Sequence, residues 1–435
     1  MKTLSFLFLL ACFVPNLGAQ NSLPMTLSEV EEKVMSENLD LKVSEQVFKE
    51  AQGDFRQTNA LLLPSIRISH TALTTTNPLM AFGFKLNQEQ LTAADFNPDL
   101  LNDPSQIETF ATRLEVMQPL INLDGFLARS AAKLKMEAME LQSQRTREYM
   151  QLGVFQAYKH LELTYELVSV YEKAKQTADA HQKLISDYLA EGLAKENDRL
   201  MVAVRVSELK SALAHAKRLQ KNASDRLFLL MNEDPKGRVI IPSSEDQTTT
   251  TSVGQFEGSL ESRKDIQAMA RATDAYQKMY QSATFSLAPR LNAFASYELY
   301  DTEIFQTGAK GYTLGAQLSW DLFDGYASAG KTQKAKAQYL KAKYEQEAYT
   351  SKSDSELRAA QRQAEDAVNQ LDLADLTLQQ AKEAYRITEN RFKEGLEKTT
   401  DLLLAETQYY EKELAYTQAV FNLSIANKLL QFLTR

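Results

Sequence analysis

The sequence predicts a mainly α-helical, internally duplicated protein in which short β-strands lead into very long helices. Two runs, Phe126 to Glu191 and Tyr326 to Glu394, contain no proline and only one glycine each, as long helices require. Four shorter stretches alternate apolar and polar residues with the period of two that is typical of strands. The same order of motifs occurs twice along the 435 residues, which indicates a duplication.

The first twenty residues have the pattern of a secretory signal peptide. An apolar core from Leu4 to Val14 follows a single lysine, and small residues near Ala19 allow cleavage, so we expect residues 1–20 to be removed on export. The stretch from Leu9 to Cys12 also resembles a lipoprotein cleavage box, in which Cys12 would be lipidated, but the apolar run continues past it as in an ordinary signal. Cys12 is the only cysteine, so the processed chain has no disulfide.

The composition argues against several classes of function. A net charge of −8 disfavours nucleic acid as a partner. No nucleophile elbow or phosphate loop occurs, so the sequence predicts neither an enzyme nor a bound cofactor. No stretch after the signal approaches the length of about eighteen apolar residues that a transmembrane helix needs. The four histidines lack the spacing of metal ligands, so no metal site is expected at His70, His160, His181 or His215.

Three pairs of motifs recur in the same order and define the two repeats. "ENLDLK" corresponds to "SRKDIQ", a proline before the first strand and Asp-Gly after the second occur in both copies, and "YLAEGLAKENDRLMVA" corresponds to "RFKEGLEKTTDLLLAE". Each repeat is expected to contain a helix, a β-hairpin, a long helix, a turn and a return helix. The predicted ranges are 21–231 for the first repeat, with hairpin about 64–122, long helix 126–190 and turn 191–197; 232–258 for a linker; and 259–435 for the second repeat, with hairpin about 289–322, long helix 326–393 and turn 394–400.

The repeats differ in the connection between their two strands. Pro64 precedes Asp124 by sixty residues, whereas Pro289 precedes Asp324 by only thirty-five. The additional residues are rich in Asn, Pro and Asp, so we expect an exposed loop at the tip of the first hairpin.

The four strands each have one apolar face, best seen from Tyr312 to Leu322. A soluble sheet packed on a protein core would explain any single strand. Strands of about nine to eleven residues with aromatic residues near their ends, such as Trp320 and Tyr326, favour instead the lipid-facing strands of a membrane barrel. The smallest such barrel has about eight strands, so closure requires several subunits; two would supply eight strands and three would supply twelve.

The long helices would each extend roughly 100 Å and must project from the strands. Ala364, Ala367, Leu371 and Ala374 recur at spacings of three and four, which predicts a coiled-coil seam of mostly small residues. An ordinary antiparallel coiled coil would explain either helix alone, but two copies beside the strands favour a helical tube. The predicted matching stripe on the return helix is Leu403, Thr407, Tyr410, Leu414, Thr417, Phe421 and Ser424.

Proline, aspartate and glycine residues mark the predicted junctions between strands and helices. The prolines would end the incoming helix and favour an extended residue before them. The glycines can adopt backbone angles that other residues avoid, and the aspartates can accept hydrogen bonds from the first free N–H groups of the next helix. These predicted junction residues, with structural rather than catalytic roles, are Pro64, Asp124, Gly125, Pro289, Asp324 and Gly325.

The repeat, "LPS" or "APR" entering the strands, "DG" leaving them, and "RFKEGLEKTTDLL" from Arg391 together resemble the TolC-like outer-membrane efflux protein family over nearly the whole processed chain. The resemblance implies a homotrimer with a 12-stranded β-barrel in outer-membrane lipid, continuous with a periplasmic α-helical barrel. It also implies a passive exit duct of a tripartite efflux or type I secretion system. The helical tips would dock to a periplasmic adaptor protein and an inner-membrane pump of the resistance-nodulation-division or ABC type.

The resemblance also assigns residues at the tips. The second copy fits the family's tip motif at Arg391, Phe392, Gly395, Leu396, Thr400 and Asp401. The first copy keeps Tyr188, Gly192, Leu193 and Asp198, but has Asp187 in place of the basic residue and Asn197 in place of the threonine.

The tip glycines and aspartates also have explanations that involve no partner. Gly192 and Gly395 lie where a helix must reverse, so a C-cap role accounts for them. Asp198 and Asp401 lie where the next helix begins and can act as N-caps. A sharper hypothesis places Asp401, with Asp198 as its counterpart, at a pore constriction where a ring of carboxylates attracts cations.

A second function from another class fits part of the pattern, namely a soluble periplasmic coiled-coil scaffold or adaptor protein. Such a protein would leave the cell on osmotic shock. A duct would require detergent and would run as a heat-sensitive oligomer on gels of unheated samples.

Overall fold

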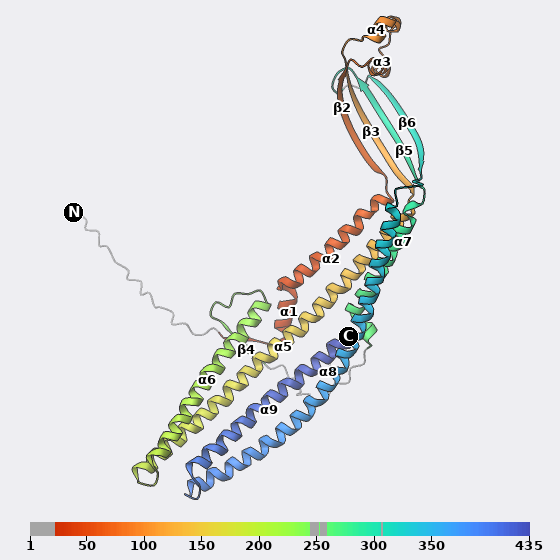
Figure 1. The fold of residues 1–435 in the computed structure, drawn as a ribbon. Helices are drawn as coiled ribbons and strands as arrows, with labels where there is room; N and C mark the ends of the chain where they lie inside the picture. The colour runs from red at the N-terminus through yellow and green to blue at the C-terminus, as the bar shows by residue number, and fades with distance from the viewer. Residues whose placement is uncertain (1–21, 244–251, 253–258, 306–307) are drawn as a thin grey trace, which may run out of the picture. The chain divides into compact units, whose positions relative to one another are not determined.

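The computed structural model describes residues 22–243, 252, 259–305 and 308–435 (Figure 1). The predicted signal peptide and Cys12 lie outside the described residues, as does most of the predicted linker. The chain forms two compact units, and each unit takes segments from both sequence repeats. We call residues 46–142 and 264–350 the strand unit, and residues 1–45, 143–263 and 351–435 the helical unit.

The strand unit contains one antiparallel sheet in the order β2-β3-β5-β6 (Figure 1). Each repeat supplies one hairpin, and the two hairpins join where β3 pairs with β5. The prediction of two hairpins is confirmed, although β3 is longer than expected. The strands are β2 (Ser65–Thr75), β3 (Ile107–Ile121), β5 (Arg290–Asp301) and β6 (Ala309–Ser319).

The predicted extension of the last strand to Leu322 is wrong, because β6 ends at Ser319. Residues after Ser319 cannot pair with β5, because Ser319 already pairs with Arg290, the first residue of β5. The indole Nε1 of Trp320 donates instead to the Leu287 carbonyl, at 3.0 Å. The aromatic residues that follow therefore lie in the junction rather than in the strand.

Phe294 breaks the alternation of β5, and its partner on β6 explains why. Phe294 pairs directly with Gly315. A Cβ atom on Gly315 would lie 2.6 Å from the Phe294 ring, so the ring covers the glycine. The aromatic side chain fills the space that the missing side chain leaves, a recurrent way of stabilising a glycine in a sheet.

The connection between β2 and β3 lies at the tip of the hairpin and is largely exposed, as predicted, but it is folded into short helices rather than a loop. It contains α3 (Pro78–Asn87), the 3₁₀ turn η2 (Ala93–Phe96) and α4 (Pro98–Asn102). Two Asn-Pro pairs, which resemble turn signals, begin these helices. Asn77 Oδ1 accepts from the Met80 amide at 3.2 Å and Asn97 Oδ1 accepts from the Asp99 amide at 3.1 Å, with proline as the first helical residue.

At the first junction the cap residue differs from the predicted one. Asn122 Oδ1 accepts from the Gly125 amide at 3.2 Å at the start of α5 (Leu123–Ala190), and Asp124 pairs with Arg290 at 2.5 Å. Gly125 lies within α5 and is not among the positive-φ residues, so both predicted roles at this junction are wrong. Glycine fits there because a Cβ would lie 2.6 Å from the Asn122 side chain.

The second junction follows the prediction. Asp324 Oδ2 accepts from the Ser328 amide at 2.9 Å, and Gly325 has a φ of +66°. The two copies differ because leucine, Leu322, occupies the position that Asn122 holds in the first copy and cannot cap. Pro64 and Pro289 each immediately precede the first residue of a strand, as expected.

The helices of the protein keep the predicted order, with an additional break near the start. The predicted first helix is two helices, α1 and α2, because Asn38 interrupts it and donates from Nδ2 to the Leu230 carbonyl at 2.8 Å. No helix of the described residues has the length and hydropathy needed to cross a membrane. The helices are α1 (Leu27–Glu37), α2 (Leu39–Gln57), α5, α6 (Glu196–Leu230), α7 (Lys264–Thr284), α8 (Ala327–Lys393) and α9 (Thr399–Leu433).

The helical unit also contains a two-stranded parallel sheet that the sequence analysis missed. It pairs β1 (Ser22–Met25) with β4 (Val239–Pro242), and β4 lies within the predicted linker. The hydroxyl of Tyr158 on α5 donates to the Met25 carbonyl at 2.9 Å. The sheet is thereby fixed to the long helix.

The coiled-coil seam predicted on α8 is confirmed around Ala364, Ala367 and Leu371, which are buried against α9. On α9 the stripe departs from the predicted one toward the C-terminus. The buried residues there are Ala419, Leu423, Ala426 and Leu430, whereas Phe421 is only partly buried and its ring lies 6.2 Å from that of His160 on α5.

Candidate functional site: the apolar strand face and the helical turns

The sheet exposes a continuous apolar surface. Ile66 and Ile68 on β2 are 69% and 72% exposed, and Leu314 and Leu318 on β6 are 75% and 66% exposed. Ile66 and Leu314 lie on the same face at opposite edges of the sheet, because both belong to the paired row that includes Val116 and Ala295. Exposed apolar area of this kind marks a surface that contacts lipid or protein rather than water. None of the described elements of the chain covers these side chains.

Large aromatic residues gather at the end of β6 where the chain enters α8. Trp320, Phe323 and Tyr326 are 61%, 76% and 76% exposed. The Phe323 and Tyr326 rings meet edge to face with centroids 5.6 Å apart. Aromatic side chains at strand ends are typical of the interface between a membrane and water.

The helical turn between α5 and α6 ends α5 with a Schellman motif. Gly192 has a φ of +75°, and its amide donates to the Leu189 carbonyl at 3.0 Å. The Leu193 amide donates to the Tyr188 carbonyl at 2.8 Å. These bonds satisfy carbonyl groups at the end of α5, so the C-cap role predicted for Gly192 is confirmed.

The turn between α8 and α9 repeats the same geometry. Gly395 has a φ of +74° and donates to the Phe392 carbonyl at 2.9 Å, while the Leu396 amide donates to the Arg391 carbonyl at 2.9 Å. Arg391 Nε lies 2.7 Å from a Glu397 carboxylate oxygen across the turn. The two repeats therefore build the same reversal from different sequences.

The structure brings the two turns together through a shared apolar cluster. Phe392 is buried with Ile185, Val202, Leu402 and Leu403, which come from all the helices of the two hairpins. Of the other predicted tip residues, Tyr188 packs at the edge of this cluster, its ring centroid 6.3 Å from that of Phe392, and Leu193, Leu396 and Thr400 are exposed. The exposed leucines form an apolar tip that is available to a partner.

The two tip aspartates differ in their contacts. Asp198 Oδ2 accepts from the Lys195 amide at 3.1 Å, so it satisfies a backbone donor at the start of α6. Asp401 occupies the same position in α9 and is exposed, and its carboxylate accepts no hydrogen bond from the described residues. Asp401 is thus the aspartate whose charge is free to act on a solute.

A buried polar cluster behind the tips was missed by the sequence analysis. Glu406 on α9 is fully buried, with an oxygen 3.5 Å from His181 Nε2 on α5 and another 3.7 Å from Arg205 Nε on α6. The sequence contained one signal for it, because Glu406 lies four residues after Leu402 and four before Tyr410, on the apolar stripe. A carboxylate at a seam position is unusual enough to mark a site.

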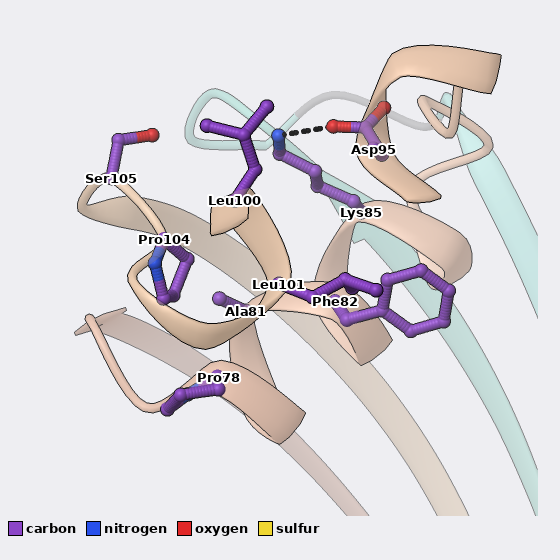
Figure 2. Close-up of a pocket in the computed structure, with 9 residues that line it drawn as sticks. All are labelled: Pro78, Ala81, Phe82, Lys85, Asp95, Leu100, Leu101, Pro104 and Ser105. Atoms are coloured by element: carbon purple, nitrogen blue, oxygen red, sulfur yellow. Dashed lines mark hydrogen bonds and ion pairs between the residues drawn. The ribbon is translucent and has the colours of Figure 1, made fainter. Parts of the chain in front are cut away.

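A small cavity lies in the folded connection between β2 and β3 (Figure 2). Its volume is about 130 Å³, and its walls include Pro78, Phe82 and Leu101. Lys85 pairs with Asp95 at 2.7 Å across it. This hydrogen bond, together with those that Thr92 donates from its amide and hydroxyl, lowers the pKa of Asp95 to about 2. The two charged groups of the cavity thus satisfy each other. The described part of the chain has no cluster of three or more side chains suited to a metal ion.

Comparison with known proteins finds a family model that matches part of the chain. Residues 257–434, the second repeat, match the family model described as outer membrane efflux protein. This part of the chain is similar to the outer membrane efflux protein family. This is a family of channel proteins rather than enzymes, and its members lie in the outer membrane with a periplasmic extension. No curated protein sequence gives a significant match.

Solved structures share the fold of this chain over nearly its whole length. A membrane protein from Pseudomonas aeruginosa aligns with a TM-score of 0.81 and 17% identity, over 94% of this chain and 93% of that one. The outer membrane protein VceC of Vibrio cholerae gives 0.77 and 17%, over 92% and 94%. The MtrE outer membrane channel of Neisseria gonorrhoeae, in its open state, gives 0.76 and 16%, over 94% and 88%.

A glycine at a tip and a glycine inside a helix provide a test in which the same substitution should have opposite effects on stability. Gly395→Ala is expected to destabilise the protein by about 1–2 kcal/mol, because alanine resists the left-handed conformation at φ +74°. Gly153→Ala, inside α5, should stabilise it by about 0.5–1 kcal/mol, because nothing lies within 4 Å of an added Cβ. Denaturant midpoints of the detergent-solubilised protein would measure both. Shifts of the same sign would contradict the assignment of Gly395 as a helix terminator.

Proposed function

We propose that the protein is a passive exit duct in the outer membrane, through which solutes leave the periplasm. The observation that carries this proposal is the uncovered apolar face of the four-stranded sheet, joined at the same end to helices of 68 and 67 residues. Lipid would cover the apolar face, and the helices would extend the passage into the periplasm. The chain supplies the conduit and no chemistry of its own.

Three copies of the chain complete the proposed duct. A sheet of four strands cannot close, because the smallest membrane barrels have about eight strands. The outer strands β2 and β6 each leave one edge unpaired in the described chain, so each can pair with a neighbouring copy. Similarity to the outer membrane efflux protein family supports three copies and a 12-stranded barrel over the two-copy alternative.

The exposed tips are the proposed docking site for a periplasmic adaptor protein, and through it for an inner-membrane pump. Leu193 and Leu396 are 72% and 60% exposed at the two turns. A photoreactive residue in place of Leu396 should capture the adaptor in cells, and mass spectrometry would identify it. The same residue at Leu229, which is 66% exposed at the far end of α6, is the matched control. Equal capture from both positions would contradict docking at the tips.

Membrane fractionation separates the duct from a soluble periplasmic scaffold. A duct requires detergent for extraction and migrates as a heat-sensitive oligomer when the sample is not boiled. Release of the processed chain by osmotic shock, as a water-soluble monomer, would overturn the proposal and support a scaffold.

Asp401 is proposed to line the narrowest part of the bore, where threefold symmetry would make a ring of carboxylates. Its exposed, unbonded carboxylate supports this role. Asp401→Ala should reduce the preference of single channels for cations and relieve block by divalent ions. Glu411→Ala removes an exposed carboxylate ten residues further along α9 and should alter neither property. Unchanged selectivity in Asp401→Ala would remove the constriction hypothesis and leave the duct itself untouched.

A further inference from the structure

Glu406 lies where the α5–α6 hairpin meets the α8–α9 hairpin, close behind the tips. His181 approaches it from α5 and Arg205 from α6, at 3.5 and 3.7 Å. From α8, the Tyr385 hydroxyl lies 3.1 Å from His181 Nε2. Tyr410, one turn further on α9, bonds to Thr177 of α5 at 2.8 Å. Side chains of all the helices in the two hairpins thus surround one carboxyl group.

The carboxyl group is buried without the hydrogen bonds that a charge requires. The Glu406 side chain is 0% exposed, and neither of its oxygens has a hydrogen-bond partner. Arg205 Nε is also buried and unbonded, so the ion pair is too long to compensate for the loss of water. Burial therefore dominates and raises the pKa of Glu406 to about 7, although Arg205 opposes the shift and Glu389 adds to it.

The groups facing Glu406 keep their own charge states near neutral pH. Burial lowers the pKa of His181, against the influence of Glu389, so that the imidazole is neutral. Burial raises the pKa values of Tyr385 and Tyr410, so that both phenols keep their protons. The remaining charged groups nearby, Glu389 and Lys393 on α8 and Glu413 on α9, lie at the margin of the cluster. Glu406 is therefore the group of this cluster that gains or loses its proton around pH 7.

Packing of the two hairpins is what keeps water from Glu406. The apolar cluster at the tips joins Ile185 and Val202 of one hairpin to Phe392 and Leu402 of the other. If the hairpins part there, Glu406 gains water and its ordinary acidity. Protonation of this residue and separation of the hairpins are therefore coupled.

We propose that Glu406 is a proton-operated latch, which as a neutral acid holds the α5–α6 and α8–α9 hairpins together and as a carboxylate favours their separation behind the tips. Its consequence for transport rests on the proposed channel function, since separation at this level would widen the periplasmic end of the duct. The latch itself is a property of the folded chain.

The sign and size of the effect follow from proton linkage. When the hairpins are packed, the pKa of Glu406 is about 7. When they are separated, it is near the ordinary value of 4.5. Packing is therefore favoured at low pH and is lost as the pH rises through this interval. Between pH 6 and pH 8 the ratio of separated to packed hairpins should increase about tenfold.

Hydrogen exchange in the unaltered trimer tests the latch without any measurement of transport. After correction for the intrinsic pH dependence of exchange, amides of residues 402–410 should lose about tenfold in protection between pH 6 and pH 8. Amides of residues 154–161, in the core that contains β1 and β4, should not change. Equal protection of residues 402–410 at both pH values would overturn the proposal, whatever the channel conducts.

A pair of variants assigns the effect to Glu406. Glu406→Gln is permanently neutral and should keep high protection at both pH values. Glu411→Gln, an exposed neighbour on α9, should behave as the unaltered protein. Persistence of the pH response in Glu406→Gln would overturn the latch, and so would low protection at both pH values, because a neutral side chain would then fail to hold the hairpins.

Discussion

Leu314→Arg is expected to prevent stable assembly of the protein in the outer membrane. Leu314 lies in the middle of β6, opposite Ala295, and its side chain is 75% exposed on the apolar face. An arginine at the midplane of a membrane barrel costs about 2–4 kcal/mol per copy. In a trimer the penalty applies three times, so we expect loss of the heat-sensitive oligomer and accumulation of the chain in the periplasm.

Thr313→Arg is the matched control because successive residues of a strand point to opposite faces. Thr313 lies opposite Ser296, on the small and polar face that would line the bore. The same charge there has access to water and should leave the oligomer intact. Gels of unheated membrane samples compare the two variants directly. Normal assembly of Leu314→Arg, or equal failure of both variants, would contradict a lipid-facing role for the apolar side.

The strand and helix types could be predicted because their signals are local. Alternation in β6 and the absence of proline in α5 and α8 depend on neighbouring residues alone. The pairing of β3 with β5 depends instead on residues as distant as Val116 and Ala295, and the sequence contains no signal for it. The four strands of this sheet were therefore predictable, whereas their order in it was not.

The first junction shows how one residue changes a prediction. Both copies carry Asp-Gly, which indicates a cap followed by a flexible residue. Asn122 precedes the first pair and caps α5 itself, which frees Asp124 to bind Arg290. Leu322 cannot do so, and Asp324 becomes the cap. The competing cap Asn122, two residues earlier, was visible in the sequence. The partner of Asp124, Arg290, comes from a distant strand and was not.

Glu406 was missed for a related reason. Its seam position was visible, but its burial depends on α5 and α6, which contribute His181 and Arg205. Sequence reasoning gave more weight to Asp401, because an aspartate at a tip motif is a local signal. The two acidic residues have opposite environments in the structure, one free in solvent and one enclosed.

The small sheet of β1 and β4 was also beyond prediction, because each strand has four residues and they pair across more than two hundred positions. Its surroundings indicate that it is structurally important. Phe228 on α6 is fully buried in the core that includes Met25 and Ile240 of the two strands. Arg238, just before β4, lies over the Phe228 ring with its guanidinium carbon 5.1 Å from the centroid.

Phe228→Ala is therefore expected to cost about 3–5 kcal/mol, the usual range for an aromatic side chain removed from a core. Such a loss would raise the local opening equilibrium more than a hundredfold, and hydrogen exchange of α6 and β4 amides would measure it. Leu229→Ala is the control, because the next side chain on the same helix is 66% exposed. It should change exchange by less than about tenfold.

The position of this core predicts which elements should open when Phe228 is lost. The sheet holds the segment that follows the proposed signal peptide against α5, through the hydroxyl of Tyr158 and the Met25 carbonyl. Loss of Phe228 should expose β1 and β4 together, because both strands pack on the same side chains. If β4 lost protection while β1 kept it, the two strands would not be one cooperative element, and the role assigned here to the parallel pair would be wrong.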